Sequence, residues 1–268
     1  MEHSAEGSGG RPLGLVTGAS SGIGEELARE MVQNGFDLIV VAEDEGILDI
    51  AAELSDLGDV HPVRADLATR AGNDMVVDVL EQQGRPLAAA AINAGIGVHG
   101  RLVETELEDH LRVIALNIVS AVHLGRWIAR DMVARGEGRL LFTSSVASQM
   151  PGPFYTTYAA SKSFVQSFSL GLREELKDTG VTVTALMPGP TATEFFDRAG
   201  MDGTKVAEGP KDDPADVARA GVAAMMAGDD HVVTGSWRNR VQSAAAGVLP
   251  DAMAAKVHRS MTEPPEDA

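Results

Sequence analysis

Tyr158 and Lys162 have the residue types and the spacing for proton chemistry. They stand four residues apart, which places both side chains on one face of a helix. A free phenol has a pKa of about 10, and a neighbouring ammonium lowers that value because it favours the phenolate. A tyrosine tuned in this way can exchange a proton near neutral pH. Tyr155 has Ala159 at the same spacing, so it has no lysine partner and is not a second candidate. The alternative for Tyr158 and Lys162 is an ordinary surface pair on a helix.

Two further polar residues fit the same chemistry. Ser145 stands thirteen residues before Tyr158, directly after a predicted strand. A hydroxyl there could bind a substrate oxygen and stabilise its developing charge, although Ser144 is adjacent and a register shift of one residue stays open. Asn117 lies within a predicted helical stretch, where a polar residue is costly unless it has a purpose.

Residues 17–24 read TGASSGIG and lie between a predicted strand and a predicted helix. The first glycine permits a tight turn, the second lets backbone approach a pyrophosphate, and the third lets the helix pack on the sheet. The N-terminus of the helix then faces the phosphates. This order of elements favours a dinucleotide site over a generic tight turn.

The positions of these residues depend on strands and helices, which are predicted to alternate regularly along the chain. Short apolar runs predict strands at Leu13–Thr17, Asp37–Ala42, Val60–Ala65, Leu87–Ile92, Arg139–Thr143, Val181–Met187 and His231–Thr234. Segments of helical period lie at 22–34, 47–57, 73–82, 105–134 (two helices or one bent helix), 157–178, 214–226 and 239–261. The alternation predicts an α/β fold, a doubly wound parallel sheet with helices on both faces. Ligands of such folds bind beyond the carboxyl ends of the strands.

The spacing T-G-x-x-x-G-x-G resembles that of the short-chain dehydrogenase/reductase family. Three later motifs agree with the family in order, each after a predicted strand. They are Asp66-Leu67, Asn93-Ala94-Gly95, and P-G-x-x-x-T at Pro188, Gly189 and Thr193. In the family the aspartate contacts adenine, the N-A-G motif supports the sheet near the cofactor, and the last motif holds the nicotinamide amide and the phosphates.

The resemblance implies hydride transfer between a nicotinamide and a carbonyl or alcohol carbon. It assigns proton exchange to Tyr158, pKa lowering and ribose binding to Lys162, positioning of the substrate oxygen to Ser145, and a bound water to Asn117. The family's separation from the tyrosine also favours Ser145 over Ser144. The expected cofactor contacts are Gly18, Ser20, Ser21, Gly22, Ile23, Gly24, Glu43, Asp66, Leu67, Asn93, Ala94, Gly95, Tyr158, Lys162, Pro188, Gly189, Thr191 and Thr193.

The choice of dinucleotide depends on the end of the second predicted strand. In the family an aspartate typical of NAD enzymes usually stands at Ala42, and an arginine typical of NADP enzymes often stands at Glu43, so this chain departs from both patterns. Glu43 and Asp44 would repel a 2′-phosphate, and an acid can accept hydrogen bonds from the ribose hydroxyls. NAD is therefore favoured over NADP, with Glu43 at the ribose. The alternative is a pair of solvated residues at a helix start.

The composition limits the partners. The 268 residues include 22 Lys and Arg against 39 Asp and Glu, a formal charge of −17, which argues against nucleic acid and anionic membrane surfaces. The chain has no cysteine and no histidine pair at ligand spacing, so no metal is predicted. No apolar run approaches the roughly 18 residues of a membrane span. Without a signal peptide pattern, a cytoplasmic location is expected.

The chain is expected to form one domain over 12–261, with a flexible N-terminus at 1–11 and a flexible acidic tail at 262–268. Residues 194–212 correspond to the family's substrate flap. Phe195, Phe196 and Met201 in this stretch suit an apolar substrate, and core packing is the alternative. The family resemblance also implies a homo-oligomer, a dimer or tetramer.

Two other functions stay open. One is a reductase of 3-ketoacyl thioesters, for which Arg126 and Arg130 could dock an acidic carrier protein. The strongly acidic chain disfavours this reading. The other is a dinucleotide sensor or scaffold without turnover, which needs none of the four polar residues assigned to catalysis.

Overall fold

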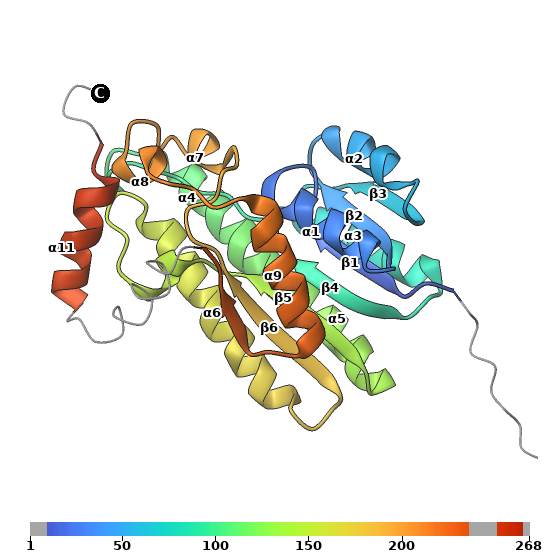
Figure 1. Cartoon of the computed structure of the whole chain (residues 1–268). Helices are drawn as coiled ribbons and strands as arrows, with labels where there is room; N and C mark the ends of the chain where they lie inside the picture. Colours follow the sequence, from blue (N-terminus) through green and yellow to red (C-terminus); the bar gives the residue numbers. More distant parts are fainter. Residues whose placement is uncertain (1–9, 236–250, 265–268) are drawn as a thin grey trace, which may run out of the picture.

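A seven-stranded parallel sheet forms the centre of the protein (Figure 1). In the computed structural model, residues 10–235 and 251–264 are described. The strand order is β3-β2-β1-β4-β5-β6-β7, and all pairs are parallel. This confirms the predicted doubly wound fold. The strands are β1 (Leu13–Thr17), β2 (Asp37–Ala42), β3 (Val60–Arg64), β4 (Leu87–Ile92), β5 (Gly138–Thr143), β6 (Val181–Met187) and β7 (His231–Val233).

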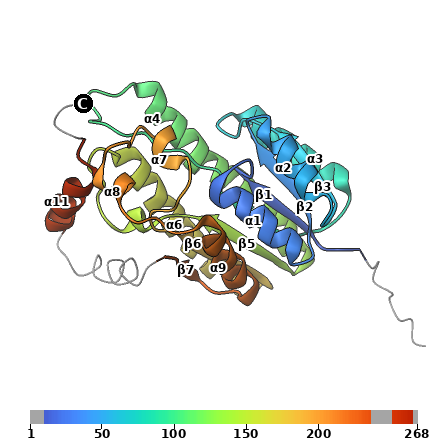
Figure 2. The same cartoon turned by 45° about the horizontal axis from the view of Figure 1, so that its top comes forward.

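Helices cover both faces of the sheet (Figures 1 and 2). One layer contains α1 (Gly22–Gln33), α2 (Gly46–Leu54) and α9 (Pro214–Ala227). The other contains α3 (Arg70–Gln83), α4 (Leu107–Ile114), α5 (Ala121–Arg135) and α6 (Thr156–Leu176). Successive side chains of β1 serve the two layers in turn: Leu15 packs in the core with α5 and α6, and Val16 packs in the core with α1 and α9. The central strands are therefore buried on both faces.

Local hydrogen bonds set the helix ends. The α3 helix begins at Arg70, earlier than the predicted 73, because the Thr69 side chain caps it by accepting from Gly72 N at 3.0 Å. The α9 helix begins at Pro214 after an Asp213 cap and ends before a left-handed glycine, which is the usual chemistry of both ends.

The predicted helical stretch at 105–134 is one continuous run from Leu107 to Arg135 with a π-helical segment, η1 (Ala115–Ser120), between α4 and α5. By length and composition alone this run could cross a membrane, contrary to the expectation that none would. Its apolar residues have another role here, because Leu124, Ile128 and Met132 are buried against the sheet. A helix that covers a sheet core needs this composition.

Short helices gather beyond the carboxyl ends of the strands (Figure 2). They are η2 (Val146–Gln149), α7 (Phe195–Arg198), α8 (Lys205–Glu208) and the longer α11 (Asp251–Thr262). Thr262, the first residue of the predicted tail, is buried in α11 and donates to the Pro153 carbonyl at 2.9 Å. The predictions for 1–9, 239–250 and 265–268 fall outside the described residues.

Candidate active site

The strand order reverses between β1 and β4, and a deep pocket opens at this point beyond the carboxyl ends of the strands. Every cofactor contact predicted from the sequence lines this pocket, from Gly18 in the first turn to Thr193 after β6. Ser145, Tyr158 and Lys162 line it as well, whereas Asn117 does not. The fold thus brings together residues that are far apart in the sequence.

The turn after β1 has the shape that a phosphate group needs. Gly18 and Gly22 have φ of 67° and 59°, in the left-handed region that favours glycine. A Cβ at Gly24 would lie 1.8 Å from the Gly18 carbonyl oxygen, so only glycine lets α1 approach the turn this closely. Ser21 at the N-cap of α1 makes no side-chain cap hydrogen bond. The amide groups of the first turn thus suit an anion, and the residues present fit a dinucleotide pyrophosphate.

Thr17 joins the two strands that flank the pocket. Its Oγ1 accepts from the Asn93 amide at 2.9 Å and from the Ala94 amide at 3.1 Å, and Asn93 Nδ2 donates to the Thr17 carbonyl at 3.2 Å. These bonds fix the N-A-G segment beside the glycine-rich turn. Thr17 belongs to the first sequence motif, but no local pattern indicates that its side chain bonds the loop after β4.

Ser145 and Tyr158 meet within the pocket. The Ser145 hydroxyl lies close enough to Tyr158 to lower the pKa of the phenol, with Tyr158 in the first turn of α6 and Ser145 at the N-cap of η2. The Ser145 oxygen also accepts from the Ala147 amide at 3.1 Å. Ser144 instead donates to the buried carbonyl of Lys162 at 2.8 Å, so its hydroxyl is engaged in holding α6. The geometry therefore favours Ser145 as the hydroxyl that faces a ligand.

Lys162 is buried below Tyr158. Its Nζ donates to the Thr143 carbonyl at 2.9 Å and lies 5.8 Å from the centre of the Tyr158 ring. A Cβ at Gly95 would lie 3.0 Å from this Nζ and 3.2 Å from Asn117 Oδ1. Gly95 therefore gives the ammonium the space it occupies.

Asn117 lies outside the pocket lining and supports the site through hydrogen bonds. It lies in η1, accepts from the Ile96 amide at 3.0 Å, and donates to the Ile96 carbonyl at 3.0 Å and to Ser161 Oγ at 2.9 Å. These bonds tie the loop after β4 to α6. A π-helical segment at this residue agrees with the frequent use of such segments at functional sites.

Burial controls the protonation of the two central side chains. It raises the pKa of Tyr158 to about 12, and the hydrogen bond from Ser145 opposes only part of this rise. Burial also lowers the pKa of Lys162 to about 8. The direction for Tyr158 is opposite to the one that an adjacent ammonium favours, because burial is the largest effect on the phenol.

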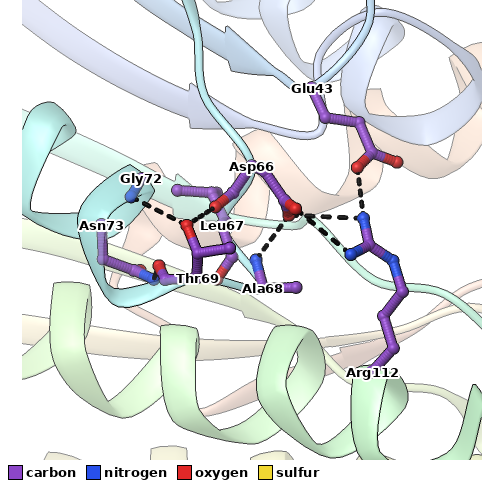
Figure 3. A network of polar contacts seen from close by, with 8 residues as sticks. All are labelled: Glu43, Asp66, Leu67, Ala68, Thr69, Gly72, Asn73 and Arg112. Atoms are coloured by element: carbon purple, nitrogen blue, oxygen red, sulfur yellow. Dashed lines mark hydrogen bonds and ion pairs between the residues drawn. The ribbon is translucent and has the colours of Figure 1, made fainter. Parts of the chain in front are cut away.

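Figure 3 shows three charged side chains at the end of the pocket where the sequence predicts the adenosine, called the adenosine end below; Glu43 and Asp66 line the pocket and Arg112 lies beside them. Arg112 extends from α4 and bonds the carboxylates of Glu43, at 2.5 Å, and Asp66, at 3.2 and 3.3 Å. The Asp44 carboxylate accepts from Ser20 Oγ at 2.7 Å. Sequence reasoning missed Arg112, because nothing near it in the chain marks it as a neighbour of the end of β2.

The opposite end of the pocket is mostly apolar. The Tyr158 ring lies 5.0 Å from the Phe195 ring and 5.9 Å from the Tyr155 ring, measured between centres. The lining there is Gln149, Met150, Tyr155, Phe195, Phe196, Met201, Val206, His258 and Met261. Gln149 and the two α11 residues were also missed. His258 and Met261 reach the pocket only because α11 packs beside it, and no local sequence pattern predicts that packing.

The fold and the pocket define a class of protein, an oxidoreductase that uses a nicotinamide dinucleotide. Comparison with known proteins narrows the class. The model of the short chain dehydrogenase family matches residues 13–202. Sulfoacetaldehyde reductase 2 of Chromohalobacter salexigens is 34% identical over 184 residues, which cover 68% of this chain and 73% of that protein.

Solved structures agree with the family model. A short-chain dehydrogenase from Sphingobium yanoikuyae in complex with NADPH has a TM-score of 0.78 and 30% identity, covering 88% of this chain and 94% of its own. A 3-ketoacyl-(acyl-carrier-protein) reductase from Brucella melitensis, complexed with NADH, has a TM-score of 0.73 and 26% identity, covering 84% and 97%. The chain belongs to the short-chain dehydrogenase/reductase family of NAD(P)-dependent oxidoreductases.

Proposed function

We propose that the protein transfers a hydride between NAD and the carbonyl or alcohol carbon of a neutral, largely apolar substrate, with Tyr158 as the acid and base. The observation that carries the proposal is the contact between Ser145 and Tyr158 inside the pocket that the glycine-rich turn also lines. A bound nicotinamide would supply the hydride chemistry. The protein's own residues would bind, orient and exchange the proton.

The protonation state of the pair suits reduction. With a pKa of about 12, the Tyr158 phenol keeps its proton at neutral pH and can donate it to a carbonyl oxygen. Ser145 lies beside the phenol in the pocket lining and can hold the same oxygen. Lys162, with a pKa of about 8, can return a proton as the phenol gives one up.

The lining of the apolar end favours a neutral substrate. Arg198 lines the pocket and is paired with Glu194 at 2.6 Å. Lys211 is outside the lining, with its Nζ 4.8 Å from the centre of the Phe196 ring. His258 is neutral at neutral pH, because burial lowers its pKa. A carboxylate or sulfonate would therefore find no unpaired cation in the described lining beyond Lys162, which bonds the Thr143 carbonyl.

The adenosine end supports NAD over NADP. Glu43 and Asp66 share one guanidinium, and Asp44, which bonds Ser20, also lines this end of the pocket, so three carboxylates lie here. A 2′-phosphate adds at least one negative charge to a place that already carries an excess of them.

A substrate panel read by the absorbance of reduced nicotinamide tests the proposal. We expect turnover of neutral apolar ketones or alcohols, faster with the NAD pair than with the NADP pair. Tyr158→Phe should lose more than about a hundredfold in turnover, the order supplied by a positioned acid, while the dissociation constant of NADH stays within about twofold. Preference for ketoacyl thioesters would favour that reductase reading, and NADH binding without any turnover would favour a sensor.

A further inference from the structure

Arg112 is the positively charged residue that contacts the carboxylates at the adenosine end of the pocket. Its two terminal nitrogens bond the carboxylates of Glu43 and Asp66, which come from the ends of two different strands (Figure 3). The Arg112 side chain is 41% exposed and that of Glu43 is 52% exposed, so both ends of this ion pair can be reached by a ligand. Asp66 is held in place independently, because it accepts from the Ala68 amide at 2.9 Å.

The Glu43–Arg112 pair determines what this guanidinium can do. A guanidinium binds phosphate through two parallel N–H bonds, more specifically than an ammonium does. In this structure Asp66 accepts from both terminal nitrogens, and Glu43 accepts from one of them. Any group that reaches the Glu43 carboxylate also lies beside Arg112, since the two are in direct contact. An adenosine ribose at Glu43, as the proposed function has it, would therefore present its 2′ position close to an arginine.

We propose that Arg112 is a masked ligand for a 2′-phosphate. Glu43 occupies one terminal nitrogen of the guanidinium and thereby keeps the pocket selective for NAD. Removal of the Glu43 carboxylate frees that nitrogen to donate to the 2′-phosphate of NADP, while Asp66 continues to hold the guanidinium in place. This inference rests on the proposed function, because it takes the ribose to lie at Glu43. It assigns the selectivity to an ion pair between β2 and α4, where the sequence pointed to Glu43 alone.

Cofactor binding without turnover tests the inference. Dissociation constants of NADH and NADPH would be measured by titrating nicotinamide fluorescence with the wild-type protein and with Glu43→Gln, Arg112→Met and the double variant. Arg64→Met is the matched control. Arg64 bonds the main-chain carbonyl of Glu43 at 3.1 Å and the carboxylate of Glu45 at 2.7 Å, but neither carboxylate that Arg112 holds.

Glu43→Gln should raise the affinity for NADPH by about tenfold or more, as expected for new charge-assisted hydrogen bonds. Arg112→Met should not improve NADPH binding, and the double variant should lose the gain. Arg64→Met should leave the ratio of the two constants within about twofold of wild type, because it spares the Glu43–Arg112 contact. Melting temperatures would verify that each variant is folded.

A gain in NADPH affinity that persists in the double variant overturns the inference but leaves the proposed function intact. The same holds if Glu43→Gln gives no gain, whereas a wild-type protein that prefers NADPH overturns both the inference and the proposed choice of NAD. A wild-type protein that binds neither dinucleotide overturns both. As a second readout, binding of 2′,5′-ADP against 5′-AMP, measured by calorimetry, should follow the same pattern, because these fragments lack the nicotinamide.

Discussion

Tyr158 and Lys162 lie where water is excluded, and burial moves their pKa values in opposite directions. The phenol keeps its proton well above neutral pH, whereas the ammonium is close to losing its own. Burial disfavours the charged form of each group, which for a phenol is the deprotonated form and for an amine the protonated form. The separation of four residues in the sequence correctly indicated that the two side chains share a helix face, but it contained no information on how far burial removes them from water.

The lowered pKa of Lys162 predicts a pH dependence of stability. Between pH 8 and about 10 the folded lysine releases its proton while the unfolded lysine, with a pKa of 10.5, still holds it. The unfolded state then binds more protons, so the free energy of unfolding rises with pH, by at most about 1.4 kcal/mol per pH unit. Above pH 10 the raised pKa of Tyr158 acts in the opposite direction.

Urea denaturation of wild type and Lys162→Met from pH 7 to 10 measures this contribution, because the other titrating groups cancel in the difference. The wild type should gain stability relative to the variant as the pH rises. Parallel pH profiles would show that the lysine is not desolvated as described.

Gln149 predicts a substrate contact. Its side-chain Oε1 is buried and has no hydrogen-bond partner among the described residues. The residue lines the pocket and stands four positions after Ser145. An unpaired buried acceptor costs about 1–3 kcal/mol, which a substrate that donates a hydrogen bond would recover. Gln149→Leu should therefore raise the melting temperature and also raise KM about tenfold. A higher melting temperature with unchanged KM would contradict a substrate role.

At the scale of elements, the alternation of strand and helix fixes where polar residues converge. Gly18, Asp66, Asn93 and Ser145 each follow a strand, so a parallel sheet brings them together whatever the loop details, and the sequence sufficed to predict this. Arg112 could not be predicted in the same way, because it lies within a helix and meets its partners only through the packing of α4.

The α11 helix was predictable as a helix over part of its length but not in its position. His258 joins it to the pocket: Nδ1 lies 2.9 Å from the Pro151 carbonyl and must donate to it, so Nε2 accepts from the Tyr155 hydroxyl at 2.6 Å. Tyr155 in turn stacks on Tyr158. These contacts span 107 residues of sequence, far beyond the reach of any local pattern.

His258→Phe should loosen this end of the pocket. The side chain stays a flat aromatic ring, one ring atom larger, while both hydrogen bonds are lost, so KM should rise about tenfold and kcat should fall less, as expected for the loss of about 1–2 kcal/mol of positioning. Steady-state kinetics on the best panel substrate would measure the change. Tyr155→Phe removes the same bond, so the two substitutions together should be less than additive. Full additivity would mean that the pair does not act as a unit.

For the whole molecule, the charge of −17 and the binding of an anionic dinucleotide are compatible, because the phosphates would meet backbone amides at the start of α1. The acidity does not extend evenly over the surface. Exposed apolar side chains occur on the face that α4, α5 and α6 cover, among them Leu111, Val119, Phe164 and Leu170. Apolar groups gathered in this way often mark a protein interface.

This face predicts self-association through the α4–α6 layer. A shallow hollow on α6 is lined by Phe164, Phe168, Gly171 and Leu172, and a Cβ at Gly171 would meet nothing within 4 Å. Gly171→Arg therefore fits the single chain and would obstruct a partner seated on this hollow. Sedimentation velocity should show a dimer or tetramer for wild type and a shift toward monomer for the variant.

Met226→Glu is the matched control, since this residue is 40% exposed on α9, in the opposite helix layer. It should leave the sedimentation coefficient unchanged. If Gly171→Arg keeps the wild-type coefficient, or if Met226→Glu also shifts toward monomer, the interface lies elsewhere. A wild-type chain that sediments as a monomer would mean that this apolar face has another occupant, because burial of its exposed side chains is what favours association.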